Sequence, residues 1–182
     1  MQNMLANLRA RREDDERGFT LIELMVVVLI IAILIAIAIP TFLGAKSRAQ
    51  DKAAQSSLRN ALTNAKGIYT DSDSYGTSAS LATGLTAAEP SLTFAAGSAT
   101  ASTGAKDVQV SVVDSTHVMF TALSSSGACY VIGDAANGPG TVFAKLSGTC
   151  SGNNAVSTLT TPSTPVSSAT NTSTADRWAT AF

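Results

Sequence analysis

The chain contains one long apolar run near its N-terminus. Every residue from 24 to 39 is apolar, and Glu23 is the only charged residue between Arg17 and Lys46. As a helix, the 21 residues that precede Pro40 would span roughly 31 Å, about the thickness of a bilayer core. Because a single segment in lipid satisfies its backbone hydrogen bonds only as a helix, the run predicts a membrane-spanning helix over residues 19–40.

A second helical pattern follows the apolar run. Across residues 41–69, alanines and larger apolar residues recur at helical spacing, while most charged side chains occupy the other positions. This pattern predicts an amphipathic helix that continues the first, giving one kinked helix of about 50 residues. Pro40 lacks an N–H group, and together with Gly44 it predicts a place where the helix bends or locally melts.

The remaining pattern predicts a small antiparallel sheet within residues 70–150. Residues 71–105 show neither helical nor strand period clearly and are expected to form a loop with short elements. Alternating β-branched and polar residues bounded by turn residues then predict four strands. The strand candidates are Asp107–Val113, His117–Leu123, Cys129–Gly133 and Thr141–Leu146. One apolar face of this sheet is expected to cover the helix, so the fold class is α+β.

Both ends of the chain differ from this core in composition. Residues 1–18 hold four arginines and four acidic residues, which is typical of a solvated arm. Residues 151–182 are rich in Ser, Thr and Asn and are interpreted as a surface tail that ends in Trp178 and Phe182. Asn171 begins a pattern for glycan attachment, but a plain solvated tail is the preferred interpretation.

The overall composition narrows the class of protein only slightly. The chain has 182 residues, of which 45% are hydrophobic and 14% are charged, with a formal net charge of −1. These values exclude a disordered acidic tail and a strongly basic nucleic-acid binder, so no direct contact with nucleic acid is predicted. After the apolar run, about 140 residues remain, which suffices for one modest domain.

Glu23 is the chemical anomaly of the apolar run. An ionised carboxylate in a membrane span costs a few kcal/mol, so it indicates a function and requires a cationic or hydrogen-bond-donating partner. The dipole of its own helix supplies only ~0.3 to 1 kcal/mol, too little to offset burial. The sequence around it, from residue 17 to residue 27, reads Arg-Gly-Phe-Thr-Leu-Ile-Glu-Leu-Met-Val-Val.

This string resembles the class III signal and N-terminal helix of type IV pilins and the related pseudopilins. The resemblance is close over residues 17–45 and loose over the helix-then-sheet layout beyond them. It implies that a prepilin peptidase cuts between Gly18 and Phe19, that the new amine of Phe19 is methylated, and that 164 residues remain. It also implies that Glu23 acts in assembly, where it meets the amine of an adjacent subunit.

The resemblance further implies a structural protein that is not an enzyme and carries no cofactor. Its partners would be the peptidase, the membrane, an inner-membrane assembly platform with a separate cytoplasmic ATPase, and other copies of itself in a helical filament. Before assembly the chain would span the cell membrane once with its N-terminus in the cytoplasm. After assembly it would lie in an extracellular pilus.

Several alternatives remain open at this stage. The nearest is a pseudopilin or minor pilin of a type II secretion or DNA-uptake machine, which shares the same N-terminal helix. A more distant one is a membrane-anchored enzyme or solute-binding domain. Ordinary secretory cleavage after residues 36–38 is a third possibility. The basic residues on the two sides of the span are equal in number, so the positive-inside rule does not fix the orientation.

Cys129 and Cys150 are the two cysteines of the chain. A zinc site would need more ligands than the single histidine, His117, provides. Cys129 opens one strand candidate and Cys150 follows the next, so a hairpin could bring the thiols within bridging distance. A disulfide is therefore predicted if this region faces the extracytoplasmic side, as the resemblance implies, with two reduced thiols as the alternative.

Two weaker signals have ordinary explanations. Residues 71–76 resemble the start of a calcium-binding loop, but the position expected to hold glutamate is Ala82. No metal site is therefore predicted, and the segment is interpreted as a turn. His117 has no nucleophile or metal partner nearby in the sequence and is interpreted as a histidine at a strand edge.

Overall fold

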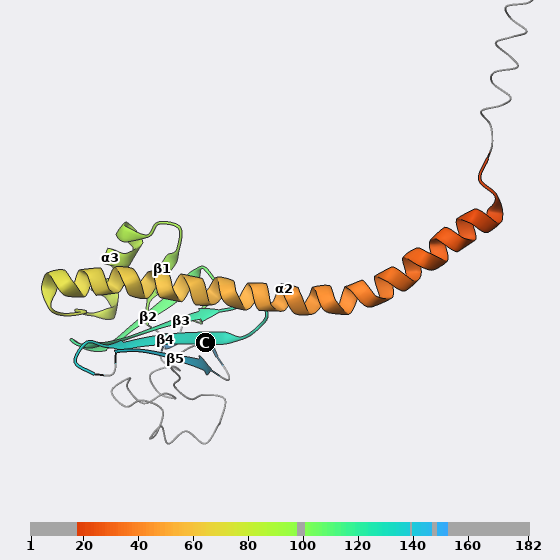
Figure 1. Ribbon diagram of the computed structural model, residues 1–182. Helices are drawn as coiled ribbons and strands as arrows, with labels where there is room; N and C mark the ends of the chain where they lie inside the picture. The colour runs from red at the N-terminus through yellow and green to blue at the C-terminus, as the bar shows by residue number, and fades with distance from the viewer. Residues whose placement is uncertain (1–17, 98–100, 139, 147–148, 153–182) are drawn as a thin grey trace, which may run out of the picture. The chain divides into compact units, whose positions relative to one another are not determined.

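In a computed structural model, residues 18–97, 101–138, 140–146 and 149–152 are described (Figure 1). Residues 1–17 of the expected N-terminal arm and residues 153–182 of the expected tail lie outside this part of the chain. The chain divides into two compact units, residues 1–44 and 45–182, and each is described by itself.

Helix α2, Leu21–Ser72, contains 52 residues and belongs to both units. It agrees with the expected single helix of about 50 residues. In the second unit it buries a stripe of small and apolar residues, a pattern that places one face of a helix on a core. The stripe consists of Ala54, Leu58, Ala61, Leu62 and Ala65.

The sheet has five strands in the order β1-β2-β3-β4-β5. Strands β2 to β5 pair antiparallel with their neighbours, and β1 pairs parallel with β2. The four expected strands are confirmed with shifts of no more than two residues at their ends. The strands are β1 Thr93–Ala96, β2 Asp107–Asp114, β3 His117–Leu123, β4 Cys129–Ala135 and β5 Gly140–Leu146.

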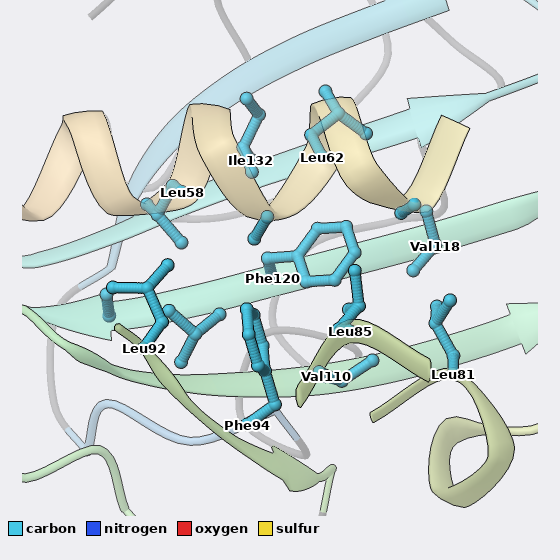
Figure 2. Packing of buried hydrophobic residues seen from close by; sticks show 14 of the residues in the cluster. Leu58, Leu62, Leu81, Leu85, Leu92, Phe94, Val110, Val118, Phe120 and Ile132 are labelled. Atoms are coloured by element: carbon cyan, nitrogen blue, oxygen red, sulfur yellow. The ribbon is translucent and has the colours of Figure 1, made fainter. Parts of the chain in front are cut away.

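The helix face of the sheet, defined as the face toward α2, carries the main core (Figure 2). Leu58 and Leu62 of α2 lie over Phe120 of β3, and residues of other strands and of helix α3, Ser78–Ala88, complete the cluster. Most of these aliphatic and aromatic side chains are less than 10% exposed. Burying such a side chain is worth about 1.5 to 3 kcal/mol, so this cluster holds helix and sheet together.

Residues 71–105 contain two elements that the sequence pattern did not resolve. Helix α3, Ser78–Ala88, packs beside β1 and β2. Its N-cap, Thr77, exchanges hydrogen bonds with Ser80 in a capping box that uses serine in place of the usual glutamate or glutamine. The element therefore begins at a cap whose sequence is unusual, which explains why it was missed.

The outer face of the sheet, defined as the face away from α2, is also buried, whereas the sequence led us to expect one dry face. By strand alternation this face carries Met119, Val131 and Val142, which are at most 4% exposed. They form a second apolar cluster with Cys129 and Cys150. The expectation of a single buried face was incomplete because polar residues such as Thr121 alternate with the apolar ones yet are themselves buried.

Candidate processing and assembly site

The site lies at the beginning of α2, where Gly18, Phe19 and Thr20 precede the first helical turn. Phe19 is 89% exposed, and a side chain at Gly18 would meet no atom within 4 Å among the described residues. Among the described residues, nothing encloses the bond between Gly18 and Phe19. Between Leu21 and Leu43 every Leu, Ile, Val, Met and Phe side chain is exposed in the isolated chain.

Glu23 has a local partner that the sequence reasoning missed. Its Oε2 accepts hydrogen bonds from the backbone N–H of Thr20 at 2.8 Å and from the Thr20 hydroxyl at 2.7 Å. The N–H of Glu23 in turn donates to Thr20 Oγ1 at 3.3 Å. This is a capping box, which satisfies donors at the first turn of the helix. The pattern Thr-x-x-Glu before an apolar run is the sequence signal that could have revealed it.

Pro40 lies inside α2, and the helix does not end there. Proline removes one N–H from the helical ladder and leaves a carbonyl of the preceding turn without its donor. The carbonyl that Pro40 deprives of a donor is that of Ala36, whereas the single hydroxyl proton of Thr41 is shared between the carbonyls of Ala38 at 2.9 Å and Ile37 at 3.4 Å. Gly44 is the last residue of the first unit. A bend at Pro40 and Gly44 stays a prediction.

Asp51 links α2 to the sheet by hydrogen bonds near the beginning of the second unit. Its Oδ1 accepts a hydrogen bond from Ser124 Oγ at 2.7 Å and another from Ser126 Oγ, both in the turn between β3 and β4. Burial opposes ionisation of Asp51, but the hydrogen bonds from Ser126, Ser124 and Tyr130 outweigh it and lower the pKa. The carboxylate is therefore ionised when it accepts these bonds.

Asp134 of β4 links the sheet to the same helix at a second position. This carboxylate is 3% exposed and accepts hydrogen bonds from the Tyr75 hydroxyl at 2.7 Å and from Thr141 Oγ1 at 2.9 Å. Lys66 of α2 places its Nζ 2.8 Å from Asp134 Oδ1. Burial and the bond to Asp134 raise the pKa of Tyr75, so its hydroxyl stays protonated and donates. Neither the contacts of Asp51 nor those of Asp134 were predicted from the sequence, because the partners lie far apart in the chain.

Cys129 and Cys150 form a disulfide in the structure. Cys129 is the first residue of β4, and Cys150 follows β5. Both cysteines are buried with the apolar residues of the outer face. The bond joins the segment after β5 to the outer face of the sheet.

The weaker candidates show no catalytic arrangement in the described part of the chain. His117 Nδ1 lies 2.8 Å from Asp114 Oδ1, and its Nε2 has no partner among the described residues. Burial opposes ionisation of Asp114, but hydrogen bonds from His117 and Thr116 outweigh it and lower the pKa to about 2. Asp71 and Asp73 stand at the end of α2, and the described residues contain no group of three or more His, Cys, Asp or Glu side chains able to hold a metal ion.

Among the described residues, α2 is the one helix long and apolar enough to cross a membrane. Comparison with known families gave a match of residues 14–39 to the prokaryotic N-terminal methylation motif. This segment is that of the type IV pilin and pseudopilin superfamily. Searches of curated proteins and of solved structures found no match.

The match indicates the general class of this protein. It supports a type IV pilin-like or pseudopilin protein with a structural role, processing by a prepilin peptidase, and anchoring in a membrane before assembly. The matched residues contain Gly18, Phe19, Thr20 and Glu23 at the start of α2, where Thr20 and Glu23 are hydrogen-bonded to each other.

Proposed function

We propose that this chain is the structural subunit of a type IV pilus filament. The single observation that supports the proposal most is the apolar surface of α2 in the first unit, where no large hydrophobic side chain is covered by the described chain. Such a surface is stable only in lipid or against other apolar helices. A motif for peptidase processing lies directly before this surface. It supports transfer of the helix from lipid to contact with other apolar helices.

In the proposed maturation, the leader, residues 1–18, is removed by cleavage between Gly18 and Phe19, and the new amine of Phe19 is methylated. Residues 19–40 then anchor the subunit in the membrane and later form the filament core, with a bend at Pro40 and Gly44. Residues 41–69 carry the sheet domain, and a platform with a separate cytoplasmic ATPase extracts the subunits. The product is a helical polymer of identical chains outside the cell.

Glu23 has two proposed partners in succession. In the membrane, its carboxylate is held by Thr20 in the capping box, which lessens the cost of an acid at the start of a span. In the filament, the α-ammonium of Phe19 from an adjacent subunit approaches the same carboxylate. Charge-assisted hydrogen bonds are about twice as strong as neutral ones, so this contact favours the polymer in the dry filament core.

Shearing the cells tests the proposal. Filaments in the sheared fraction are examined by electron microscopy and their subunits by mass spectrometry of the N-terminus. We expect this chain to be the main subunit and to begin with methylated Phe19. A bulky residue at Gly18 should leave unprocessed chains in the membrane.

Two other results would redirect the assignment. A small share of this chain in filaments built from another subunit would identify a minor pilin or pseudopilin. A mature chain that begins at Ile39 would show ordinary secretory cleavage and would remove the proposed filament core.

A further inference from the structure

The second unit is balanced in charge but divided along α2. Within its described residues, seven Lys or Arg side chains balance seven Asp or Glu side chains. Along residues 45–73, five Lys or Arg side chains lie at or before Lys66, whereas two of the three Asp side chains, Asp71 and Asp73, come after it. The two ends of this segment therefore attract opposite charges.

The basic edge, defined as Arg48, Lys52 and Lys145, lies near the start of the unit. Arg48 and Lys52 are four residues apart on α2 and so share one side of the helix, and all three side chains are exposed. Lys145 of β5 lies near Asp51 and stabilises its carboxylate electrostatically. Because Asp51 already accepts two serine hydrogen bonds from the turn between β3 and β4, the cations outnumber the acid at this edge.

The acidic end, defined as Asp71 and Asp73, lies at the other end of the segment. Both residues are exposed, and neither forms an ion pair within 4 Å among the described residues. The N–H of Tyr75 donates to the carbonyl of Ser115 at 2.9 Å, which places this end beside the turn after β2. Asp114, the exposed last residue of β2, adds a third carboxylate there.

The basic edge and the acidic end of one chain do not meet. Lys52 and Asp71 lie on one continuous helix, and 19 residues at 1.5 Å per residue place them about 28 Å apart. Side chains do not bridge such a distance. The complement of each surface must therefore belong to another molecule, and a second copy of the chain carries both complements.

We propose that the basic edge of one subunit binds the acidic end of a second copy that is displaced along α2 by about 30 to 35 Å. This displacement brings Arg48 beside Asp71 of the next copy and Lys52 beside its Asp73. The inference rests on the proposed function, because anchoring in one membrane gives all copies the same direction. Copies that lie side by side without displacement would place like charges together, which electrostatic complementarity disfavours.

The contact uses a different surface on each copy. Such a heterologous contact leaves one basic edge and one acidic end open after every addition, so it continues into a helical polymer instead of closing into a dimer. It would set the register between the folded units of neighbouring subunits, a role separate from that of the apolar helices in the filament core.

Zero-length cross-linking tests the contact directly. A carbodiimide, which joins an ammonium to a carboxylate without a spacer, is applied to whole cell envelopes with any filaments attached, and linked peptides are identified by mass spectrometry. We expect Lys52 to be linked to Asp71 or Asp73, a link that the distance along α2 forbids within one chain. Lys52→Arg is the matched control, because it keeps the charge but removes the amine, so it should assemble normally without the link.

Absence of these links from wild-type envelopes would overturn the proposal. Links from Lys52 only to other carboxylates, or to peptides of another protein, would overturn it as well, because they would show a different occupant of the basic edge.

Charge reversal supplies a second test. Arg48→Glu/Lys52→Glu and Asp71→Lys/Asp73→Lys should each lower the yield of sheared filaments by about tenfold or more, because each pair of changes places like charges across the contact. All four substitutions in one chain exchange the signs of the two surfaces and should recover most of the yield.

Lys46→Glu/Lys106→Glu is the matched control for net charge. Both lysines are exposed and lie outside the basic edge, so this variant should keep a yield near that of the wild type. An equal loss in this control, or no recovery in the fourfold variant, would overturn the contact. Wild-type cells that shed no filaments would instead contradict the proposed function, and the cross-link in whole envelopes would still decide on the contact.

Discussion

The ammonium of Lys66 on α2 lies 2.8 Å from the buried carboxylate of Asp134 on β4. The two groups differ in burial, since the lysine side chain is 47% exposed and the aspartate side chain 4%. Lys66 can turn to water if it loses its partner, whereas Tyr75, which also donates to Asp134, cannot. The consequences of removing either member of the pair are therefore unequal.

We expect Asp134→Ala to lower the free energy of unfolding by about 3 kcal/mol, because it leaves the buried Tyr75 hydroxyl without an acceptor and opens a cavity. Lys66→Met should cost about 1 kcal/mol or less, because Asp134 keeps two hydrogen bonds. Urea unfolding of the full chain, followed by near-ultraviolet circular dichroism, measures both. Equal losses would show that the ion pair, and not the tyrosine bond, dominates.

The lowered pKa of Asp114 predicts a dependence on pH. An acid whose pKa is lower in the folded state contributes stability above its unfolded pKa, about 3.9, and loses it as the pH falls through about 2. Wild type should therefore exceed Asp114→Asn in stability above pH ~4, and the difference should shrink toward pH 2. Urea titrations across this range measure the difference. A gap that is constant with pH would mean that Asp114 acts through shape alone.

Reduction of the disulfide should destabilise the domain. The bridged residues are 21 positions apart, for which loop-closure entropy gives about 3 kcal/mol. The melting temperatures of the oxidised chain, the reduced chain and a Cys129→Ser/Cys150→Ser variant are compared, and the reduced chain should resemble the variant.

Alkylation of the exported chain under denaturing conditions without reductant supplies the check on oxidation. Two labelled thiols would rule out the bridge in the cell. An unchanged melting temperature on reduction would deny it a structural role.

The capping box predicts separate effects for its two members. Thr20→Ser keeps a hydroxyl and should assemble normally, whereas Thr20→Val should weaken the first turn by about 1 kcal/mol. Glu23→Ala should leave insertion into the membrane intact or improved and should lower the yield of filaments. Quantifying chain in membrane and sheared fractions separates the two steps. Normal filament yield with Glu23→Ala would remove Glu23 from assembly.

The close approach of Gly152 to Ser111 predicts that a substitution at one residue can offset a substitution at the other. Gly152→Ala should destabilise the fold because its Cβ would overlap Ser111 Oγ, and Ser111→Gly in the same chain should recover part of the loss. Gly97→Ala is the matched control, because its Cβ would also meet the backbone carbonyl oxygen of Val110, which Ser111→Gly cannot remove. A double-mutant cycle measures the coupling. Additive losses at 152 and 111 would show that the two residues do not touch.

Local patterns predicted the elements whose period is strong. The apolar run, the amphipathic continuation and the strands after residue 106 depend on spacing within one segment, so α2 and β2 to β5 could be predicted. Helix α3 begins at an unusual cap, and β1 has only four residues, so both escaped. The position of β1 parallel to β2 is set by packing that no local pattern contains.

The functional residues and contacts also differ in whether a local sequence pattern could predict them. Gly18, Phe19 and Glu23 lie within six residues of one another and were predicted from a contiguous motif, whereas the hydrogen bonds of Thr20 required the helix start to be placed within one residue. The contacts of Asp51 with Ser124, and of Asp134 with Tyr75, join residues 73 and 59 positions apart. Such pairs depend on the register of the whole sheet, so one sequence does not reveal them.

The two polar attachments of α2 to the sheet, through Asp51 and Lys66, have a mechanical consequence. Asp51 and Lys66 are 15 residues apart, about 22 Å along the helix, and they bond to opposite ends of β4 and its flanking turn. A pull applied along the axis of residues 45–72 of α2 would load both attachments, and the leucines between them, in shear at the same time. Detachment would then require many contacts to fail together rather than one after another, so the sheet domain should resist tension far better than peeling.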